Sequence, residues 1–154
     1  MDIYDYIVRD HRDVAGLMDD ILSIRLPAVR ASLFEQVRAE LSLHDSAEEQ
    51  TFYAAIVAAD REMAGRMRHS KLEHREVDDL LETLHDTPIS SEFWLEKFGE
   101  LKHAITHHVA EEEGEIFARG RQVITPAQAV QLAQDMEDVK SRMREDAELN
   151  IPVE

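Results

Sequence analysis

Apolar side chains recur at steps of three and four residues along most of the chain, which is the spacing of one face of an α-helix. No stretch shows the strict alternation of apolar and polar residues that is typical of a half-buried β-strand. Glycines and prolines are few and lie mainly at the breaks between the periodic segments. The pattern predicts five helices, at about residues 2–24, 30–59, 62–85, 91–119 and 126–147.

Two helix starts carry capping signatures. Thr125 precedes Pro126, and Gln128 follows the threonine by three residues, which is the pattern of a capping box with proline at the first helical position. Before the fourth helix, Ser90 or Ser91 follows Pro88 and predicts an N-cap.

Each of the first four predicted helices carries one histidine in the middle of its apolar stripe. These histidines are His11, His44, His74 and His108. On two helices a glutamate follows four residues later, as Glu48 and Glu112, and residues four apart lie on the same helix face. The fifth helix has an apolar stripe without a histidine.

Four helices joined by short loops predict an up-down-up-down bundle. When residues are counted from the breaks between the helices, the histidines of the first three helices lie at similar heights along the bundle axis. We therefore expect an all-α fold, in which residues 1–120 form a metal-binding four-helix bundle. Residues 121–154 are expected to add a C-terminal helix that packs on the bundle within the same domain.

Charge and cysteine content narrow the partners and the chemistry. The 154 residues carry a formal net charge of −16, so we expect neither nucleic acid nor an anionic membrane surface as a partner. The chain has no cysteine, which excludes disulfides, thiolate nucleophiles and Cys-ligated metal centres. No signal peptide and no apolar run of about 20 residues is visible, so a cytoplasmic location is expected.

The apolar stripes of the first four helices, here called seams, are expected to face one another in the core. Four histidines and two glutamates at one level of these seams require a compensating positive charge. An ionised carboxylate in an apolar interior is very costly without a partner. No Lys or Arg lies on the four seams near that level. A metal centre supplies the charge, and two carboxylates that bridge ions indicate two ions rather than one. Nitrogen and oxygen donors without thiolate suit iron, manganese or zinc.

Other interpretations explain less of the pattern. A single histidine on an apolar seam is more often a hydrogen-bonded core residue than a ligand, but four of them on four helices favour a metal. The Glu-x-x-His motif of ferritin-like bundles occurs at residues 82–85 and 100–103, at a helix end and off the seam. Haem held by two histidines would not require two buried glutamates. His107 and Glu111 lie about 100° from the His108 seam, so we expect them to be mostly solvated.

Four segments carry these residues: DHRDV (10–14), LHDSAEEQTFY (43–53), LEHREVDDLL (72–81) and HHVAEEEGEIF (107–117). In order and spacing they resemble the haemerythrin-like family, the HHE cation-binding domain. The resemblance covers the first four helices and implies a non-haem di-iron centre that interacts with oxygen or related small oxidants. It also implies a set of metal ligands, with Glu48 and Glu112 as bridges: His11, His44, Glu48, His74, His108 and Glu112.

The chain departs from the oxygen-carrying members of that family. They have a fifth histidine one turn from the third-helix ligand, where this chain has Ser70 and Asp78. Some relatives place a carboxylate directly after the second-helix histidine, and Asp45 occupies that position. Alternatively, water fills the place and leaves an open coordination position. The proline that often follows the motif is replaced by Ala54 and Ala118, which concerns helix continuation.

Several function classes follow from the resemblance. The first is a protein that binds, senses or reacts with oxygen, peroxide or nitric oxide. The second is an enzyme with catalase, peroxidase or nitric-oxide-handling activity, and the third is iron storage or a structural metal site. The implied cofactor is a pair of iron ions, with manganese or zinc as alternatives. The implied ligand is a small diatomic molecule or a peroxide.

Overall fold

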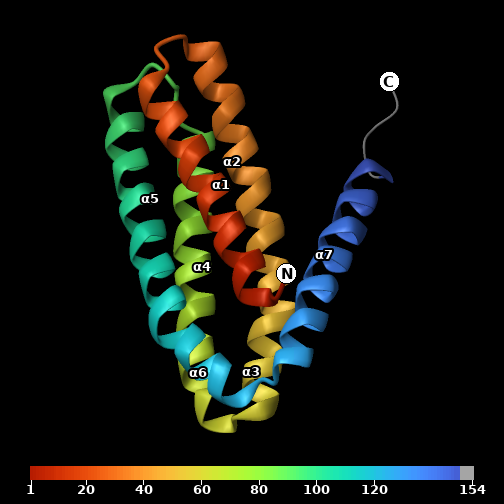
Figure 1. Cartoon of the computed structure of the whole chain (residues 1–154). Coiled ribbons are helices and arrows are strands. Elements are labelled where there is room, and N and C mark those ends of the chain that lie inside the picture. Colours follow the sequence, from red (N-terminus) through yellow and green to blue (C-terminus); the bar gives the residue numbers. More distant parts are fainter. Residues whose placement is uncertain (150–154) are drawn as a thin grey trace.

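The computed structural model describes residues 1–149 and consists of helices joined by short turns (Figure 1). The α-helices are α1 Ile3–Ser23, α2 Pro27–Glu48, α3 Ala54–Ala59, α4 Ala64–His85, α5 Glu92–Glu111, α6 Phe117–Val123 and α7 Pro126–Leu149. Two π-helical segments, η1 Glu49–Tyr53 and η3 Glu112–Ile116, join α2 to α3 and α5 to α6 without a break. The 3-10 turn η2, Arg61–Met63, leads into α4. Residues 150–154, the end of the predicted C-terminal segment 121–154, lie outside the described residues.

The long helices form the predicted up-down-up-down bundle, which confirms the all-α fold. Figure 1 shows α1, α2, α4 and α5 side by side, while α7 lies outside them against α1 and α2. The second helix begins at Pro27 rather than near residue 30. Proline is well suited to a first helical position, because the N–H that it lacks has no intrahelical partner there. Within residues 1–149, no helix is both long enough and apolar enough to cross a membrane.

Both predicted caps are present. The Thr125 N–H donates to Gln128 Oε1 at 2.9 Å, and the Gln128 N–H donates to Thr125 Oγ1 at 3.2 Å. This reciprocal pair is a capping box and sets the start of α7. At the start of α5 the cap is Ser91, whose Oγ accepts from the Phe93 N–H at 3.1 Å.

Two apolar clusters fill the interior and leave a polar layer between them. The cluster toward α3 and α6 contains Ile7, Phe52 and Ile116. The cluster at the opposite end of the bundle contains Val14 and Leu101. The four seam histidines and the two glutamates occupy the layer between the clusters, as their places in the helical stripes predict.

Candidate metal centre

The structure brings the six seam residues into two groups that share both glutamates. One group is His11, His44, Glu48 and Glu112, and the other is Glu48, His74, His108 and Glu112. Within each group, one donor atom of every residue lies within 4.8 Å of the others. Both glutamate side chains are fully buried. The arrangement offers two candidate metal positions, with the two carboxylates between them.

Each glutamate turns one oxygen toward each group. On one side, His11 Nε2 lies 3.2 Å from Glu112 Oε1, and His44 Nε2 lies 3.3 Å from Glu48 Oε2. On the other side, His74 Nε2 lies 3.3 Å from Glu48 Oε1 and His108 Nε2 lies 3.3 Å from Glu112 Oε2. Ligand atoms about 2 Å from a common ion are roughly 3 Å apart, so these distances are compatible with an ion between the donor atoms.

Several of the donor atoms lack a partner within the described chain. They are His11 Nε2, His44 Nε2, both carboxylate oxygens of Glu48, and Glu112 Oε1. Buried polar atoms are nearly always hydrogen-bonded, since each unpaired one costs about 1–3 kcal/mol. All five atoms belong to the two groups, so the donor set fits metal ions that prefer nitrogen and oxygen ligands.

Each of the four histidines directs its other ring nitrogen, Nδ1, at a carboxylate from a neighbouring helix. The pairs are His44 with Asp10 at 2.8 Å, His74 with Glu49 at 2.7 Å, His108 with Glu73 at 3.0 Å and His11 with Glu113 at 2.9 Å. In the order α1, α2, α4, α5, each helix, with its π-helical continuation, supplies a carboxylate to the histidine of the next. We call these four acids the outer ring. A carboxylate on Nδ1 holds the proton there and leaves Nε2 free to bind a metal.

The outer ring was not expected from the sequence, although a signal for it exists. Each acid of the ring is the sequence neighbour of a residue in the centre, in the pairs Asp10–His11, Glu48–Glu49, Glu73–His74 and Glu112–Glu113. Adjacent helical residues are rotated by about 100°, so such an acid points toward the next helix rather than the bundle axis. An acidic residue directly beside a seam ligand in the sequence is therefore the signal that indicates a member of the outer ring.

Tyr53 is a further buried residue at the centre that the apolar spacing did not single out. Its hydroxyl donates to Glu112 Oε2 and lies 3.4 Å from both His74 Nε2 and His108 Nε2. Its ring stacks on that of His74 with 5.5 Å between the centroids. Tyr53 ends η1, and the i→i+5 turn of a π-helix brings the fifth residue after Glu48 back to the same face. A spacing of 3.6 residues does not indicate this position.

Asp45, like Tyr53, lies close to His74. Its Oδ1 is 3.5 Å from His74 Nε2, and the side chain is nearly buried. Burial raises the pKa of Asp45 to about 6, against the lowering effect of the nearby histidines. At the positions of the missing fifth histidine, Ser70 is fully buried with its Oγ unpartnered among the described residues, whereas Asp78 is exposed. Ligation by Asp45 stays a prediction.

Nearby carboxylates favour the protonated forms of the buried histidines. Burial opposes protonation of His44, but Glu48 and other nearby carboxylates raise its pKa to about 10. The pKa values of His74 and His108 are raised to about 11 and about 9, likewise against the effect of burial. Burial would raise the pKa of Glu112, but the nearby imidazoles of His108 and His11 hold it well below its usual range. A metal cation that binds these imidazoles would therefore displace protons from them.

A buried cation on α7, the predicted C-terminal helix, contacts one acid of the outer ring. Lys140 of α7 is only 2 % exposed, and its ammonium donates to the Asp10 oxygen that also bonds His44 Nδ1. Burial would raise the pKa of Asp10, but the hydrogen bonds from His44 and Lys140 lower it. The four seams carry no Lys or Arg at this level, as expected, but α7 supplies one through tertiary packing.

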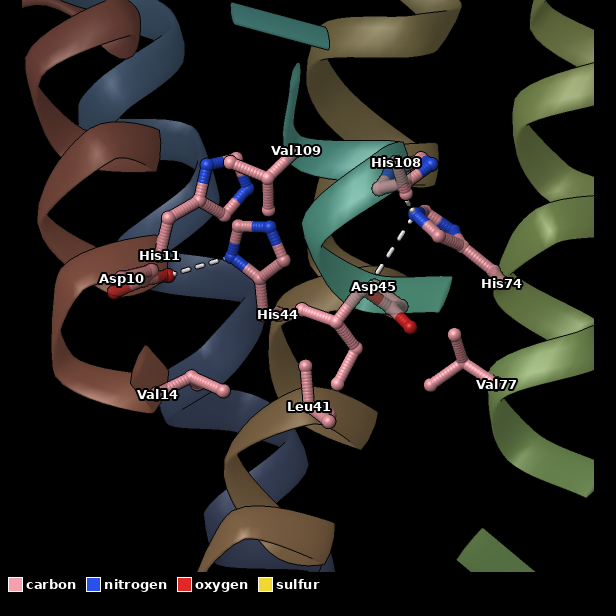
Figure 2. Close-up of a pocket in the computed structure, with 11 residues that line it drawn as sticks. Asp10, His11, Val14, Leu41, His44, Asp45, His74, Val77, His108 and Val109 are labelled. Carbon is pink, nitrogen blue, oxygen red and sulfur yellow. Dashed lines mark hydrogen bonds and ion pairs between the residues drawn. The ribbon is translucent and has the colours of Figure 1, made fainter. Parts of the chain in front are cut away.

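A cavity of about 20 Å³ adjoins the centre. Figure 2 shows His11 and His44 on one side of it and His74 with Asp45 on the other. The apolar part of its lining comes from Val14, Leu41, Val77, Ile105 and Val109. A water molecule needs roughly 10–15 Å³ of such space, so the cavity accommodates a molecule of about that size.

The remaining histidines lie outside the centre. His69, His85, His103 and His107 are all exposed. Glu82 and Glu100, the acids of the two Glu-x-x-His motifs, are exposed as well. A ferritin-like arrangement of these motifs in the core is therefore absent from residues 1–149.

Comparison with known proteins agrees with this geometry. The chain is similar over 96 % of its length to a crystal structure of a haemerythrin HHE cation-binding domain-containing protein from Mycobacterium kansasii, with a TM-score of 0.82, 27 % identity and 90 % of that chain covered. An uncharacterized protein of Mycobacterium tuberculosis is 28 % identical over 138 residues, which cover 88 % of this chain and 83 % of the relative. A DNA nickase of Nostoc sp. is 26 % identical over 147 residues; the match covers 94 % of this chain but only 41 % of that protein's length. The model of the haemerythrin HHE cation-binding domain matches residues 2–119, so the chain belongs to this family and is a metal-binding, haemerythrin-like protein.

Proposed function

We propose that this protein holds a non-haem di-iron centre at which a small oxidant, namely oxygen, peroxide or nitric oxide, binds or reacts. The observation that carries the proposal is the sharing of Glu48 and Glu112 between two pairs of histidines. His11 and His44 serve one ion, and His74 and His108 serve the other. Asp45 is the proposed additional ligand where the oxygen carriers of the family use a fifth histidine. Manganese and zinc are the alternative metals for such a donor set.

The protein's own residues prepare the site for that chemistry. When bound, two iron ions supply redox chemistry and coordination positions for a small oxidant. The outer ring orients the imidazoles, and the apolar lining keeps bulk water away from the metal positions. The Tyr53 hydroxyl donates to Glu112 and so holds that bridging carboxylate in place.

The size of the cavity supports a small ligand rather than an organic substrate. Its volume of about 20 Å³ suits a diatomic molecule or peroxide, whereas sites for drug-sized molecules have volumes of about 300–1,000 Å³. The net charge of −16 argues against direct binding of a nucleic-acid backbone by this chain.

A second candidate function is catalytic turnover of peroxide or nitric oxide. Two groups that can carry a proton, Tyr53 and an Asp45 that is not bound to metal, lie at 3.4 Å and 3.5 Å from the same nitrogen, His74 Nε2. Reduction of these oxidants consumes protons, and an acid whose pKa is about 6 is well placed to exchange them near neutral pH. This observation favours an enzyme over a pure carrier.

The proposal is tested by loading the protein with ferrous iron under anaerobic conditions. We expect two irons per chain and, after exposure to air, the optical spectrum of an oxo-bridged ferric pair. His74→Ala should lower the iron content sharply, and His103→Ala, which changes an exposed histidine on α5, should not. A single iron per chain, or a Soret band in the purified protein, would overturn the di-iron assignment.

Steady-state assays with hydrogen peroxide and nitric oxide then separate the function classes. Turnover by the loaded protein supports the enzyme, and stoichiometric binding without turnover supports a carrier or sensor. A loaded centre whose spectrum responds to none of the three oxidants would instead indicate storage or a structural metal site.

A further inference from the structure

Two more His-x-x-x-Glu pairs lie outside the metal centre. His69 and Glu73 are on α4, and His107 and Glu111 are on α5. In each pair the residues are four apart and share a helix face. Because α4 and α5 pack side by side along their length (Figure 1), the two pairs meet across the surface between these helices.

The donor atoms of three of these residues are close enough for a common cation, and His107 lies beside them. One donor atom each of His69, Glu73 and Glu111 lies within 4.8 Å of the other two. Glu73 Oε2 lies 3.7 Å from His69 Nε2 and 3.6 Å from His107 Nε2. His107 Nε2 also lies 2.9 Å from Glu111 Oε1. Both imidazoles are more than half exposed and therefore have room to turn toward a shared cation.

The carboxylates of Glu73 and Glu111 each have one oxygen atom that accepts no hydrogen bond from a described residue. Glu73 is nine-tenths buried and accepts from His108 Nδ1 with Oε1, so its Oε2 faces the two exposed histidines. Glu111 Oε2 is buried and makes no hydrogen bond to any described residue. Arg66 Nη2 lies 3.5 Å from this oxygen but closer to Glu115, at 3.1 Å. Each of the two carboxylates can therefore still accept a cation on one oxygen.

We propose that His69, Glu73, His107 and Glu111 form a separate site for one divalent transition-metal cation on the α4–α5 face. Two imidazoles and two carboxylates without thiolate are a ligand set suited to Zn²⁺ or Fe²⁺. The exposed histidines make the site accessible from solvent, in contrast to the buried centre. Neither the site nor its test depends on the proposed di-iron function.

Glu73 links this outer site to the centre. Its Oε1 holds His108 Nδ1, and its Oε2 is a ligand of the outer cation. A cation on Oε2 draws negative charge away from Oε1, which weakens the hold on the His108 imidazole. Occupancy of the outer site therefore changes the environment of one centre ligand, His108, through Glu73.

The test is zinc binding by the full chain, followed by metal analysis after gel filtration and by anomalous diffraction at the zinc edge. We expect one zinc among the four residues, in addition to any metal in the centre. The double variant His69→Ala/His107→Ala should lose one equivalent and this anomalous peak, and it should fold normally because both side chains are exposed. His103→Ala is the matched control and should lose nothing.

Two further variants make the outcome decisive. His74→Ala/His108→Ala removes ligands of the centre and should leave the outer equivalent in place, so failure of the centre and failure of the outer site are distinguishable. Arg66→Ala removes a competing cation and should tighten outer binding by several-fold. Equal zinc content in the wild type and the His69→Ala/His107→Ala variant, or no anomalous peak at saturating zinc, would overturn the proposal.

Discussion

Lys140 of α7 and His44 of α2 bind the same carboxylate oxygen, Oδ2 of Asp10. The helix that lies outside the four-helix bundle thus supplies the one buried ammonium at the level of the centre, among the residues that the structure describes. The same ammonium lies over the ring of Tyr6, 4.7 Å from its centroid. Docking of α7 and orientation of a predicted metal ligand are therefore coupled through Asp10.

Replacement of Lys140 by methionine should destabilise the protein strongly. The change keeps an apolar stem but leaves the Asp10 carboxylate with a single charged partner, and breaking a buried ion pair costs about 3 kcal/mol or more. Urea denaturation of the chelator-treated protein measures the loss. Arg142→Met, at an exposed position on the same helix, should change the free energy of unfolding by less than about 0.5 kcal/mol. Similar losses for the two variants would show that the buried pair contributes little.

Loss of charge in the outer ring should weaken metal binding without removing a ligand. Glu49→Gln keeps the size of the side chain that bonds His74 Nδ1 but not its charge. Mutations of such partners typically lower metal affinity by about 10- to 100-fold. Competition with a chelator measures the affinity, and Glu115→Gln, at an exposed position in η3, is the control. An unchanged competition curve for Glu49→Gln would mean that the ring does not tune the ligands.

The residues of the centre were predictable because they interrupt an apolar seam. On α5 and its continuation η3, His108 and Glu112 continue the line of Leu101 and Ile105, and only one helix face is buried. A period of 3.6 residues therefore locates inward-facing ligands even before the helices are placed in space.

Two features needed the three-dimensional structure, for different physical reasons. Tyr53 reaches the centre through a π-helical turn, whose i→i+5 spacing has no distinct signature in a run of helix-forming residues. Lys140 lies on the apolar stripe of α7, and its contact with Asp10 depends on how α7 packs against α1. Helix periodicity alone does not specify that packing.

Removal of the Tyr53 hydroxyl should lower stability and change the spectrum of the loaded centre. The hydroxyl donates to the buried Glu112 carboxylate, and a hydrogen bond to a charged group contributes about 1.5–3 kcal/mol. Tyr53→Phe should retain two irons per chain, because it removes neither a histidine nor a glutamate.

Tyr4→Phe is the matched control for this change. The Tyr4 hydroxyl is also buried but has no hydrogen-bond partner in the described structure, so its loss should cost little or even stabilise the protein. Thermal unfolding and optical spectroscopy compare the two variants. Equal effects of the two substitutions would contradict a specific role for the Tyr53–Glu112 contact.

Metal uptake should release protons, and the protein without metal should lose stability as the pH rises. The pKa values of His44, His74 and His108 are about 10, 11 and 9, above the ordinary value of about 6.5 for an unfolded histidine. Raised values mean that their stabilisation is fully present below about pH 6.5 and is lost as the pH rises through 9 to 11. At pH 8 these imidazoles are protonated and must release their protons to bind metal. Calorimetry of metal binding in buffers of different ionisation enthalpy should report this release, and an enthalpy independent of the buffer would show that the imidazoles are already neutral.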